Sequence, residues 1–265
     1  MVDLSNTEIV FHHTVSIPRS DDFHRHMHNG YELLYFVEGD AEYIIESSVY
    51  KLHPGDMLFI PPRKFHYLLP LSETKYERFV IHFSMSCVPE ILKNFVETSS
   101  SIYRIASGSH IERFFNTWAD AEAMLSSLEM NEYIRSGLPH LLLFLKHLPS
   151  PSNVHPVRKD STLESILQYI DAHPEERLTA ESLSRIFYIS SSWIVHSFKK
   201  NLGISLMQYI QKKRILYAEA MIYNGFSPTE VAKQCNYESY TTFYRQYKKI
   251  LGVSPADTQK SSRNN

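Results

Sequence analysis

Three histidines and a glutamate in the N-terminal half are the residues of this sequence best suited to bind a ligand. They occur as His26-x-His28-x3-Glu32, with a further histidine at His66. Alternate residues of a β-strand share a face, so the side chains of His26 and His28 converge if this segment is extended. Imidazole and carboxylate groups bind divalent ions of Fe, Mn, Ni or Zn, and the same groups hydrogen-bond polar small molecules. The pattern therefore predicts a polar ligand site.

The chain around these histidines has the pattern of short β-strands. Residues 31–37 are apolar on both faces, rich in aromatic side chains and followed by a Glu-Gly-Asp turn. Further strands are predicted over residues 41–47, 57–60 and 76–83, and the last of these has one apolar and one more polar face. Short strands joined by turns with glycine, proline or aspartate are typical of an antiparallel barrel or sandwich, here over residues 1 to about 84.

After residue 84 the apolar spacing becomes helical. Residues 89–97, 111–130 and 132–147 have apolar side chains at every third or fourth position, which predicts helices that close the barrel and form a homodimer. Residues 148–156 contain three prolines among serine and asparagine, as expected of a linker at a domain boundary. From residue 161 to about 251 the pattern is helical throughout.

The C-terminal half contains a degenerate internal repeat. Residues 178–203 and 227–252 are each 26 residues long and offset by 49, and both end in an aromatic residue, Lys-Lys, two further residues and glycine. Each copy has the pattern of helix, short turn and helix, and Ser227, Pro228 and Glu230 are suited to begin the first helix of the second copy. The predicted helix between the copies, residues 205–224, spans about 30 Å. Successive major-groove faces on one side of DNA lie ~34 Å apart, so two copies on such a helix suit a DNA-binding unit.

The charge distribution also indicates a polyanionic partner for the C-terminal half. Residues 158–265 contain 15 lysines and arginines against 10 aspartates and glutamates, whereas the preceding residues contain 12 against 19. No apolar run is long enough to cross a membrane, and no secretory signal is evident, so we expect a cytoplasmic protein that does not bind membranes. Cys87 and Cys235 are expected to be reduced core thiols.

The repeat resembles the C-terminal region of the AraC/XylS family of bacterial regulators. The resemblance covers residues 161–258 and rests on the Phe-Lys-Lys-x-x-Gly ending, the segment 225–232 and the following Tyr237, Phe243 and Arg245. It implies DNA binding near promoters, usually with activation, and then contact with RNA polymerase. The family's base-contacting positions correspond here to Ser192, Val195, His196, Tyr240, Thr241, Thr242 and Arg245. Lys199 and Lys248 are also expected to contact DNA, at its phosphates.

The first unit departs from the family pattern at one of these positions. His196 stands where the family often has arginine, and a histidine lacks the bidentate fork that arginine offers to guanine. We therefore expect Arg245 to contribute more sequence specificity than any residue of the first unit. Ser197 also replaces a usual apolar residue, and Asn236 a usual glycine.

The histidine segment resembles the two motifs of cupin barrels. The matching residues are His26-x-His28-x3-Glu32-x6-Gly39 and Gly55-x5-Pro61-x-Arg63-x2-His66, with Arg63 where many cupins have glycine. The resemblance implies that Glu32 and His66 complete a metal set with His26 and His28. Three interpretations stay open: a metalloenzyme, an effector sensor, and a structural cluster whose side chains only hydrogen-bond one another. The AraC/XylS resemblance favours the sensor, with a sugar as one candidate effector bound by His26, His28, Tyr31, Glu32, Tyr43, Arg63, His66 and His82.

We therefore predict an α+β protein of two domains. Residues 1–148 form a cupin-like antiparallel β-barrel with dimerisation helices, 149–160 a linker, 161–258 an all-α domain with two helix-turn-helix units joined by a long helix, and 259–265 a disordered tail. The predicted function is an effector-responsive transcriptional regulator, an activator and not an enzyme, with double-stranded DNA as partner and no cofactor. The alternative is a metal-dependent cupin enzyme or metal sensor with an accessory helical domain.

Overall fold

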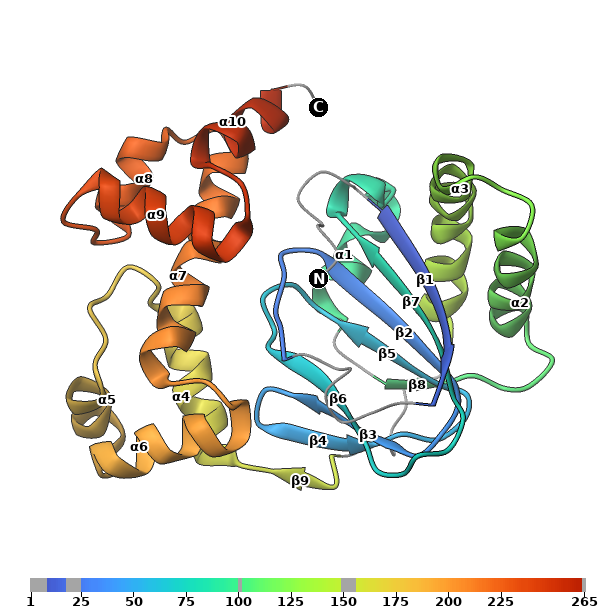
Figure 1. Ribbon diagram of the computed structural model, residues 1–265, viewed down its shortest axis with the longest axis horizontal. Helices are drawn as coiled ribbons and strands as arrows, with labels where there is room; N and C mark the ends of the chain where they lie inside the picture. The colour runs from blue at the N-terminus through green and yellow to red at the C-terminus, as the bar shows by residue number, and fades with distance from the viewer. Residues whose placement is uncertain (1–8, 18–24, 100–101, 149–155, 264–265) are drawn as a thin grey trace. The chain divides into compact units, whose positions relative to one another are not determined.

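The fold is that of a computed structural model, which describes residues 9–17, 25–99, 102–148 and 156–263 (Figure 1). The chain forms two compact units that divide between Arg158 and Lys159, close to the end of the predicted linker. Residues 149–155 of that linker lie outside the described residues. Within the described residues, every helix is too short or too polar to cross a membrane.

The N-terminal unit is built on two antiparallel sheets. The first has the strand order β1 (Ile9–Ser16), β7 (Tyr76–Phe83), β2 (Tyr31–Glu38), β5 (Asp56–Ile60) and β8 (Ile102–Arg104). The second has the order β6 (His66–Pro70), β3 (Ala41–Ile45), β4 (Ser48–Lys51) and β9 (Arg158–Lys159). A two-residue bridge between His26 and His66 extends the second sheet, with N–O distances of 3.1 and 2.9 Å.

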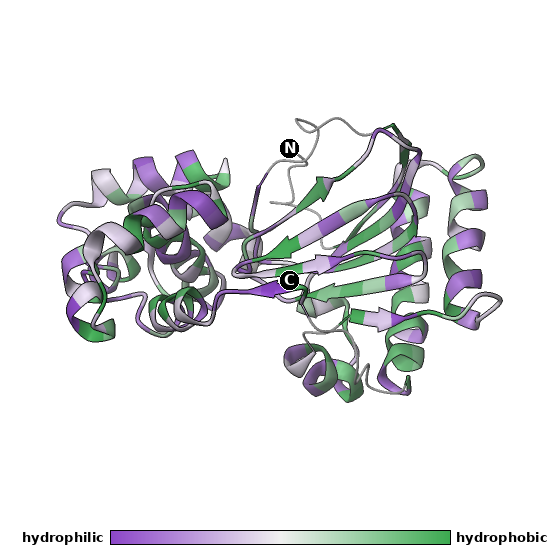
Figure 2. Cartoon of the chain, turned by 90° about the horizontal axis from the view of Figure 1, so that it is seen from below, coloured by the Kyte–Doolittle hydropathy of each residue, from purple (hydrophilic) through white to green (hydrophobic). Residues whose placement is uncertain are grey.

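Strand β2 is apolar on both faces because it lies between two cores. Leu33 and Tyr35 pack toward the helices, and Leu34 and Phe36 pack toward the second sheet. A strand buried on both faces reads as a continuous apolar run, which explains the pattern of residues 31–37. The hydropathy colouring shows such apolar segments along the strands (Figure 2).

Three helices cover the outer face of the first sheet: α1 (Glu90–Thr98), α2 (His110–Glu122) and α3 (Ser127–Lys146) (Figure 1). The single helix predicted over residues 111–130 is two helices, because Ser126 caps α3 and forms a capping box with Glu129. The region predicted as wholly helical also contains β8, which pairs with β5.

Gly137 lets α3 approach α2 closely. An added Cβ at Gly137 would lie 2.7 Å from Cζ2 of Trp118, whose buried ring is held by Phe11 and Phe115 at centroid distances of 5.9 and 5.4 Å. Alanine favours a helix by about 1 kcal/mol over glycine, but overpacking a core costs about 1–3 kcal/mol. Gly137→Ala is therefore expected to lower the free energy of unfolding by about 1 kcal/mol in urea denaturation. Ser136→Ala, at the exposed neighbouring position, is the control; a stabilised Gly137→Ala variant would contradict the close packing.

After β9, the described residues of the C-terminal unit form helices and their connections. The helices are α4 (Ser161–Ala172), α5 (Ala180–Phe187), α6 (Ser191–Ser197), which continues as a π-helical turn (Phe198–Leu202), α7 (Leu206–Tyr223), α8 (Pro228–Gln234), α9 (Tyr240–Leu251) and α10 (Pro255–Arg263). The predicted signals are present: Ser227 caps α8, Pro228 occupies its first turn and Ser205 begins α7 with a capping box. The two predicted helix-turn-helix units are therefore α5–α6 and α8–α9, joined by α7.

Two details of this unit differ from the expectations. The apolar spacing of the first copy predicts that Leu183 and Ile186 both face inward; Leu183 is fully buried, whereas Ile186 is 40% exposed. Helix α10 extends to Arg263, within the stretch expected to be a disordered tail, and residues 264–265 lie outside the described residues. Tyr247 of α9 donates a hydrogen bond to Thr258 Oγ1 at 2.9 Å, which holds α10 against the second unit.

Cys235 lies in the core of the second helix-turn-helix unit and is fully buried. Burial raises the pKa of its thiol to about 11, against an ordinary value of about 8.5. Only the thiolate is nucleophilic, and at pH 8 about one thiol in a thousand would be ionised. Iodoacetamide at pH 8 is therefore expected to leave Cys235 unmodified in the folded protein and to modify it fully in urea, as measured by mass spectrometry. Rapid labelling without urea would contradict this packing.

Candidate functional site

The second helix of each helix-turn-helix unit presents one exposed polar face. All nine predicted DNA-contacting residues are exposed, four from α6 and the turn that continues it and five from α9. They are Ser192, Val195, His196, Lys199, Tyr240, Thr241, Thr242, Arg245 and Lys248. The structure thus brings the predicted residues of each unit to the outside of one helix.

Local folding explains this arrangement. Ser190 caps the start of α6, where its Oγ accepts a hydrogen bond from the backbone N–H of Trp193. Ser239 caps the start of α9 in the same way, with the backbone N–H of Thr242. The N–O distance is 3.2 Å in both caps. On the opposite side of each helix an apolar pair four residues apart is fully buried, Ile194 with Phe198 and Phe243 with Tyr247. Because residues three or four apart share a helix face, the intervening polar residues must face outward.

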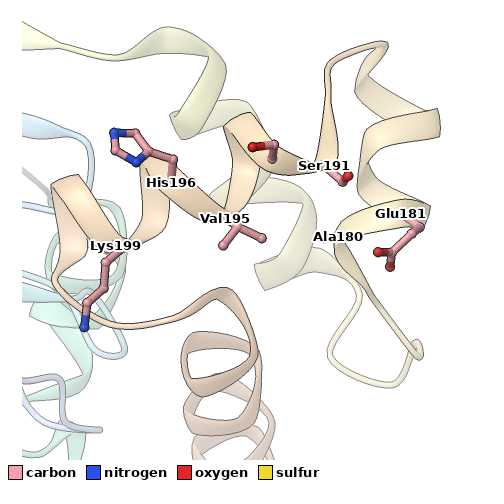
Figure 3. A pocket seen from close by; sticks show the side chains of 7 residues that line it. Ala180, Glu181, Ser191, Val195, His196 and Lys199 are labelled. Carbon is pink, nitrogen blue, oxygen red and sulfur yellow. The ribbon is translucent and has the colours of Figure 1, made fainter.

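An open groove lies beside α6 in the first unit. Its lining residues are Ala180, Glu181, Ser191, Ser192, Val195, His196 and Lys199, most of them labelled in Figure 3. Four of them belong to the predicted DNA-contacting set. Glu181 adds a carboxylate to this surface, which disfavours a phosphate next to it.

Polar contacts fasten α7 to α4 and to the connection between α4 and α5. Arg214 of α7 donates hydrogen bonds to the backbone oxygens of Pro174 (3.1 Å) and Glu176 in the α4–α5 connection. Lys213 of α7 is 5% exposed and forms an ion pair of 2.7 Å with Asp171 of α4. These contacts anchor the α4–α5 connection, which leads into the first helix-turn-helix unit, on α7.

The turn of the second unit is tied to the same connection. Asn236 has a positive φ of 57°, which asparagine tolerates better than most residues, and its side chain donates to the backbone oxygen of Glu175. This position is where the sequence departs from the family's glycine. The role of Arg214 in fastening α7 to this connection has no local sequence signal, whereas the unusual Asn236 marks the tie of the second helix-turn-helix unit to it.

In the N-terminal unit the predicted ligand residues gather around one carboxylate. Glu32 is 2% exposed, and its Oε2 lies 3.1 Å from Nε2 of His28, 3.1 Å from Nε2 of His66 and 2.8 Å from Nε2 of His82. The buried hydroxyl of Tyr43 donates to the other oxygen, Oε1, at 3.1 Å. Strand pairing places these groups together, since Glu32 of β2 is opposite His82 of β7.

Burial and charge oppose each other at this cluster. Burial alone would raise the pKa of Glu32, but the neighbouring charges of His66 and His82 and the hydrogen bonds from His28 and His66 hold that pKa well below its usual range. Burial lowers the pKa of His28, and this outweighs the opposite effect of Glu32. Burial also raises the pKa of Tyr43 well above its usual value. Glu32 is therefore a buried anion with the histidines as its polar neighbours.

Two of the predicted ligand residues lie apart from this cluster. Tyr31 is on the opposite face of β2, where its ring stacks on Phe83 at a centroid distance of 5.5 Å. Successive residues of a strand point to opposite faces, so Tyr31 and Glu32 cannot both face the space between the sheets. Arg63 is exposed, and its backbone N–H donates to the backbone oxygen of His28 at 2.7 Å. His26 is exposed, but its ring is 4.3 Å from that of His66.

The structure adds one residue that the sequence analysis did not select. His12 of β1 has its ring 6.2 Å from that of His82, and its buried Nε2 has no hydrogen-bond partner among the described residues. Burial, and then the nearby His82 and Arg78, lower the pKa of His12. Its position depends on the register of β1 with β7, for which the sequence holds no local signal.

Comparisons with known proteins agree with the two units. A family model described as an AraC-like ligand binding domain matches residues 15–135, and one described as a helix-turn-helix domain matches residues 183–261. The HTH-type transcriptional regulator YdiP of Escherichia coli K12 is 23% identical over 93% of this chain and 84% of its own length. The regulator YobQ of Bacillus subtilis 168 is 23% identical over 88% of this chain and 87% of its own. Among solved structures, ToxT of Vibrio cholerae O395 is 15% identical, with a TM-score of 0.43 over 96% of this chain and 99% of its own.

Proposed function

Because this chain belongs to the AraC family of transcriptional regulators, with a ligand-binding domain followed by a helix-turn-helix domain, we propose that α6 and α9 read two short DNA elements about one helical turn apart. The observation that carries the proposal is the exposed polar face on each of these helices, backed by a fully buried apolar pair. Arg214 and Lys213 fasten α7 to α4 and the α4–α5 connection, and Asn236 ties the turn of the second helix-turn-helix unit to the same connection.

Each exposed residue has a role in this proposal. Arg245 reads a guanine through a bidentate contact, while Ser192, His196 and Thr241 make single hydrogen bonds to bases. Lys199 and Lys248 neutralise phosphates and position the helices without reading sequence.

The N-terminal unit is proposed to bind the effector at the cluster around Glu32. Charged, hydroxyl and imidazole groups within an apolar surrounding suit a small polar molecule, and a sugar is the candidate we favour. Binding would act by favouring one of two states that differ in DNA affinity. The chain is proposed to regulate transcription without catalysing a reaction, and to contact RNA polymerase as an activator.

Helices α2 and α3 are proposed to form the homodimer. Their outward side chains include Leu128, Leu143 and Phe144, which are 75%, 46% and 42% exposed. Large apolar side chains exposed on a surface helix suit a protein–protein contact. A dimer would place four recognition helices on one promoter.

Selection of bound DNA from a random pool by the full chain tests the proposed function. We expect enrichment of two short elements about one helical turn apart, with an affinity that falls as salt is raised because lysines and arginines displace counterions. A folded protein that enriches no motif would overturn the proposal.

A further inference from the structure

The groove beside α6 carries opposite charges at its two ends. Lys199 lies in the turn that continues α6, and Glu181 lies in the first turn of α5. Figure 3 shows these two side chains at opposite ends of the groove, with Val195 between them. Ser192 and His196, which are proposed to contact bases, line the same groove. The carboxylate of Glu181 is therefore part of the surface that is proposed to face DNA.

Glu181 carries its negative charge at neutral pH. Hydrogen bonds from its own backbone N–H and from the hydroxyl of Thr179 lower the pKa of Glu181 below its ordinary value. The side chain is exposed, so its charge acts directly on whatever approaches the start of α5. A DNA backbone that approached here would meet an anion.

The capping of α5 does not depend on this carboxylate. Thr179 and Ser182 form the capping box, in which each side-chain oxygen accepts the other residue's backbone N–H, at 3.1 and 2.9 Å. The equivalent position of the second copy, 49 residues further on, is Glu230, which is the third residue of α8 and accepts a hydrogen bond from its cap, Ser227, at 2.6 Å. A glutamate thus occurs at this position of both copies, although its place in the cap differs. This pattern favours a role for Glu181 at the surface over a role in beginning the helix.

The position of Glu181 is the one at which a helix-turn-helix unit meets the DNA backbone. The first helix of such a unit crosses the backbone while the second lies in the major groove. The N-terminus of a helix attracts phosphate through its free N–H groups and the positive end of its dipole. A carboxylate in the first turn opposes that attraction, because like charges repel.

We infer that Glu181 excludes DNA phosphates from the start of α5, so that the backbone contacts the Lys199 end of the groove and the sequence-independent affinity of the first unit stays low. The inference rests on the proposed DNA binding. Binding to non-target DNA comes almost entirely from phosphate contacts, so removing one of them weakens it whatever the base sequence. Base contacts from α6 then supply a larger share of the free energy of binding, as suits a regulator that must find few sites among an excess of other DNA.

A charge series at position 181 of the full chain tests this inference. Glu181→Gln removes the charge, and we expect its affinity for a duplex without the selected motif to rise roughly 2- to 10-fold. The slope of log affinity against log salt concentration should become steeper by about one, since one more phosphate is neutralised or approached. Glu181→Lys should raise the affinity further. Fluorescence anisotropy with duplexes that carry and lack the motif measures these changes, and circular dichroism shows that each variant is folded.

Glu73→Gln is the matched control. It makes the same change of net charge in the N-terminal unit, at an exposed position between β6 and β7, and should bind DNA as the wild type does. Unchanged or weaker binding by Glu181→Gln, or an equal gain by Glu73→Gln, would overturn the inference alone. A loss confined to duplexes with one particular base would also overturn it and assign Glu181 to base reading. Absence of any DNA binding by the wild type would overturn the proposed function as well.

Discussion

Replacement of Phe243 by alanine is expected to lower the free energy of unfolding of the C-terminal unit by about 3–5 kcal/mol. The Phe243 ring is fully buried and packs against the rings of Tyr237 and Tyr247 at centroid distances of 5.2 and 5.4 Å. Truncation removes these contacts and leaves a cavity in the core that orients α9. Since domains are stable by only ~5–15 kcal/mol, much of the folded population should be lost on mild heating.

Thermal and urea unfolding followed by circular dichroism measure this effect, and DNA affinity should fall in parallel. Tyr244→Ala is the matched control, because Tyr244 is the next residue of the same helix and is 36% exposed. A surface substitution of this kind changes stability by about 0.5 kcal/mol or less. If both variants had the same midpoint of urea unfolding as the wild type, Phe243 would not be part of a core that orients α9.

Replacement of Arg245 by alanine is expected to weaken binding to the selected DNA motif by about 1–3 kcal/mol, or roughly 5- to 150-fold. Arg245 is exposed on α9, on the side opposite the buried pair Phe243 and Tyr247. Its guanidinium can donate two parallel hydrogen bonds to a guanine, so the loss should be confined to sequences that carry that base. Fluorescence anisotropy with the motif and with single-base variants of it measures both effects.

Lys248→Ala separates base reading from phosphate binding. Lys248 is exposed one turn further along α9. An alanine there should weaken binding to all sequences alike and lower the slope of log affinity against log salt concentration by about one. An equal loss of affinity on every sequence for Arg245→Ala would instead assign Arg245 to a phosphate and leave base reading to the other exposed residues.

Much of the C-terminal unit was predictable because its signals are local. Ser227 with Pro228 marks the start of α8, and the apolar spacing of Phe243 and Tyr247 defines the buried side of α9. Caps and helical periodicity act over one or two turns, so they are readable before any tertiary contact forms. The alternation in residues 76–83 likewise showed which side of β7 is polar.

What the sequence by itself determined were the helix-turn-helix units, the outward residues of α6 and α9 and the short-strand character of residues 31–83. The tertiary structure alone decided which polar groups meet: β1 pairs with β7 and brings His12 beside His82, while the face of β2 that carries Glu32 excludes Tyr31. It also decided that Arg214 fastens α7 to the α4–α5 connection and that β8 completes the first sheet. Such contacts join residues far apart in the chain, and strand register is set by the packing of whole faces, for which no single segment carries the signal.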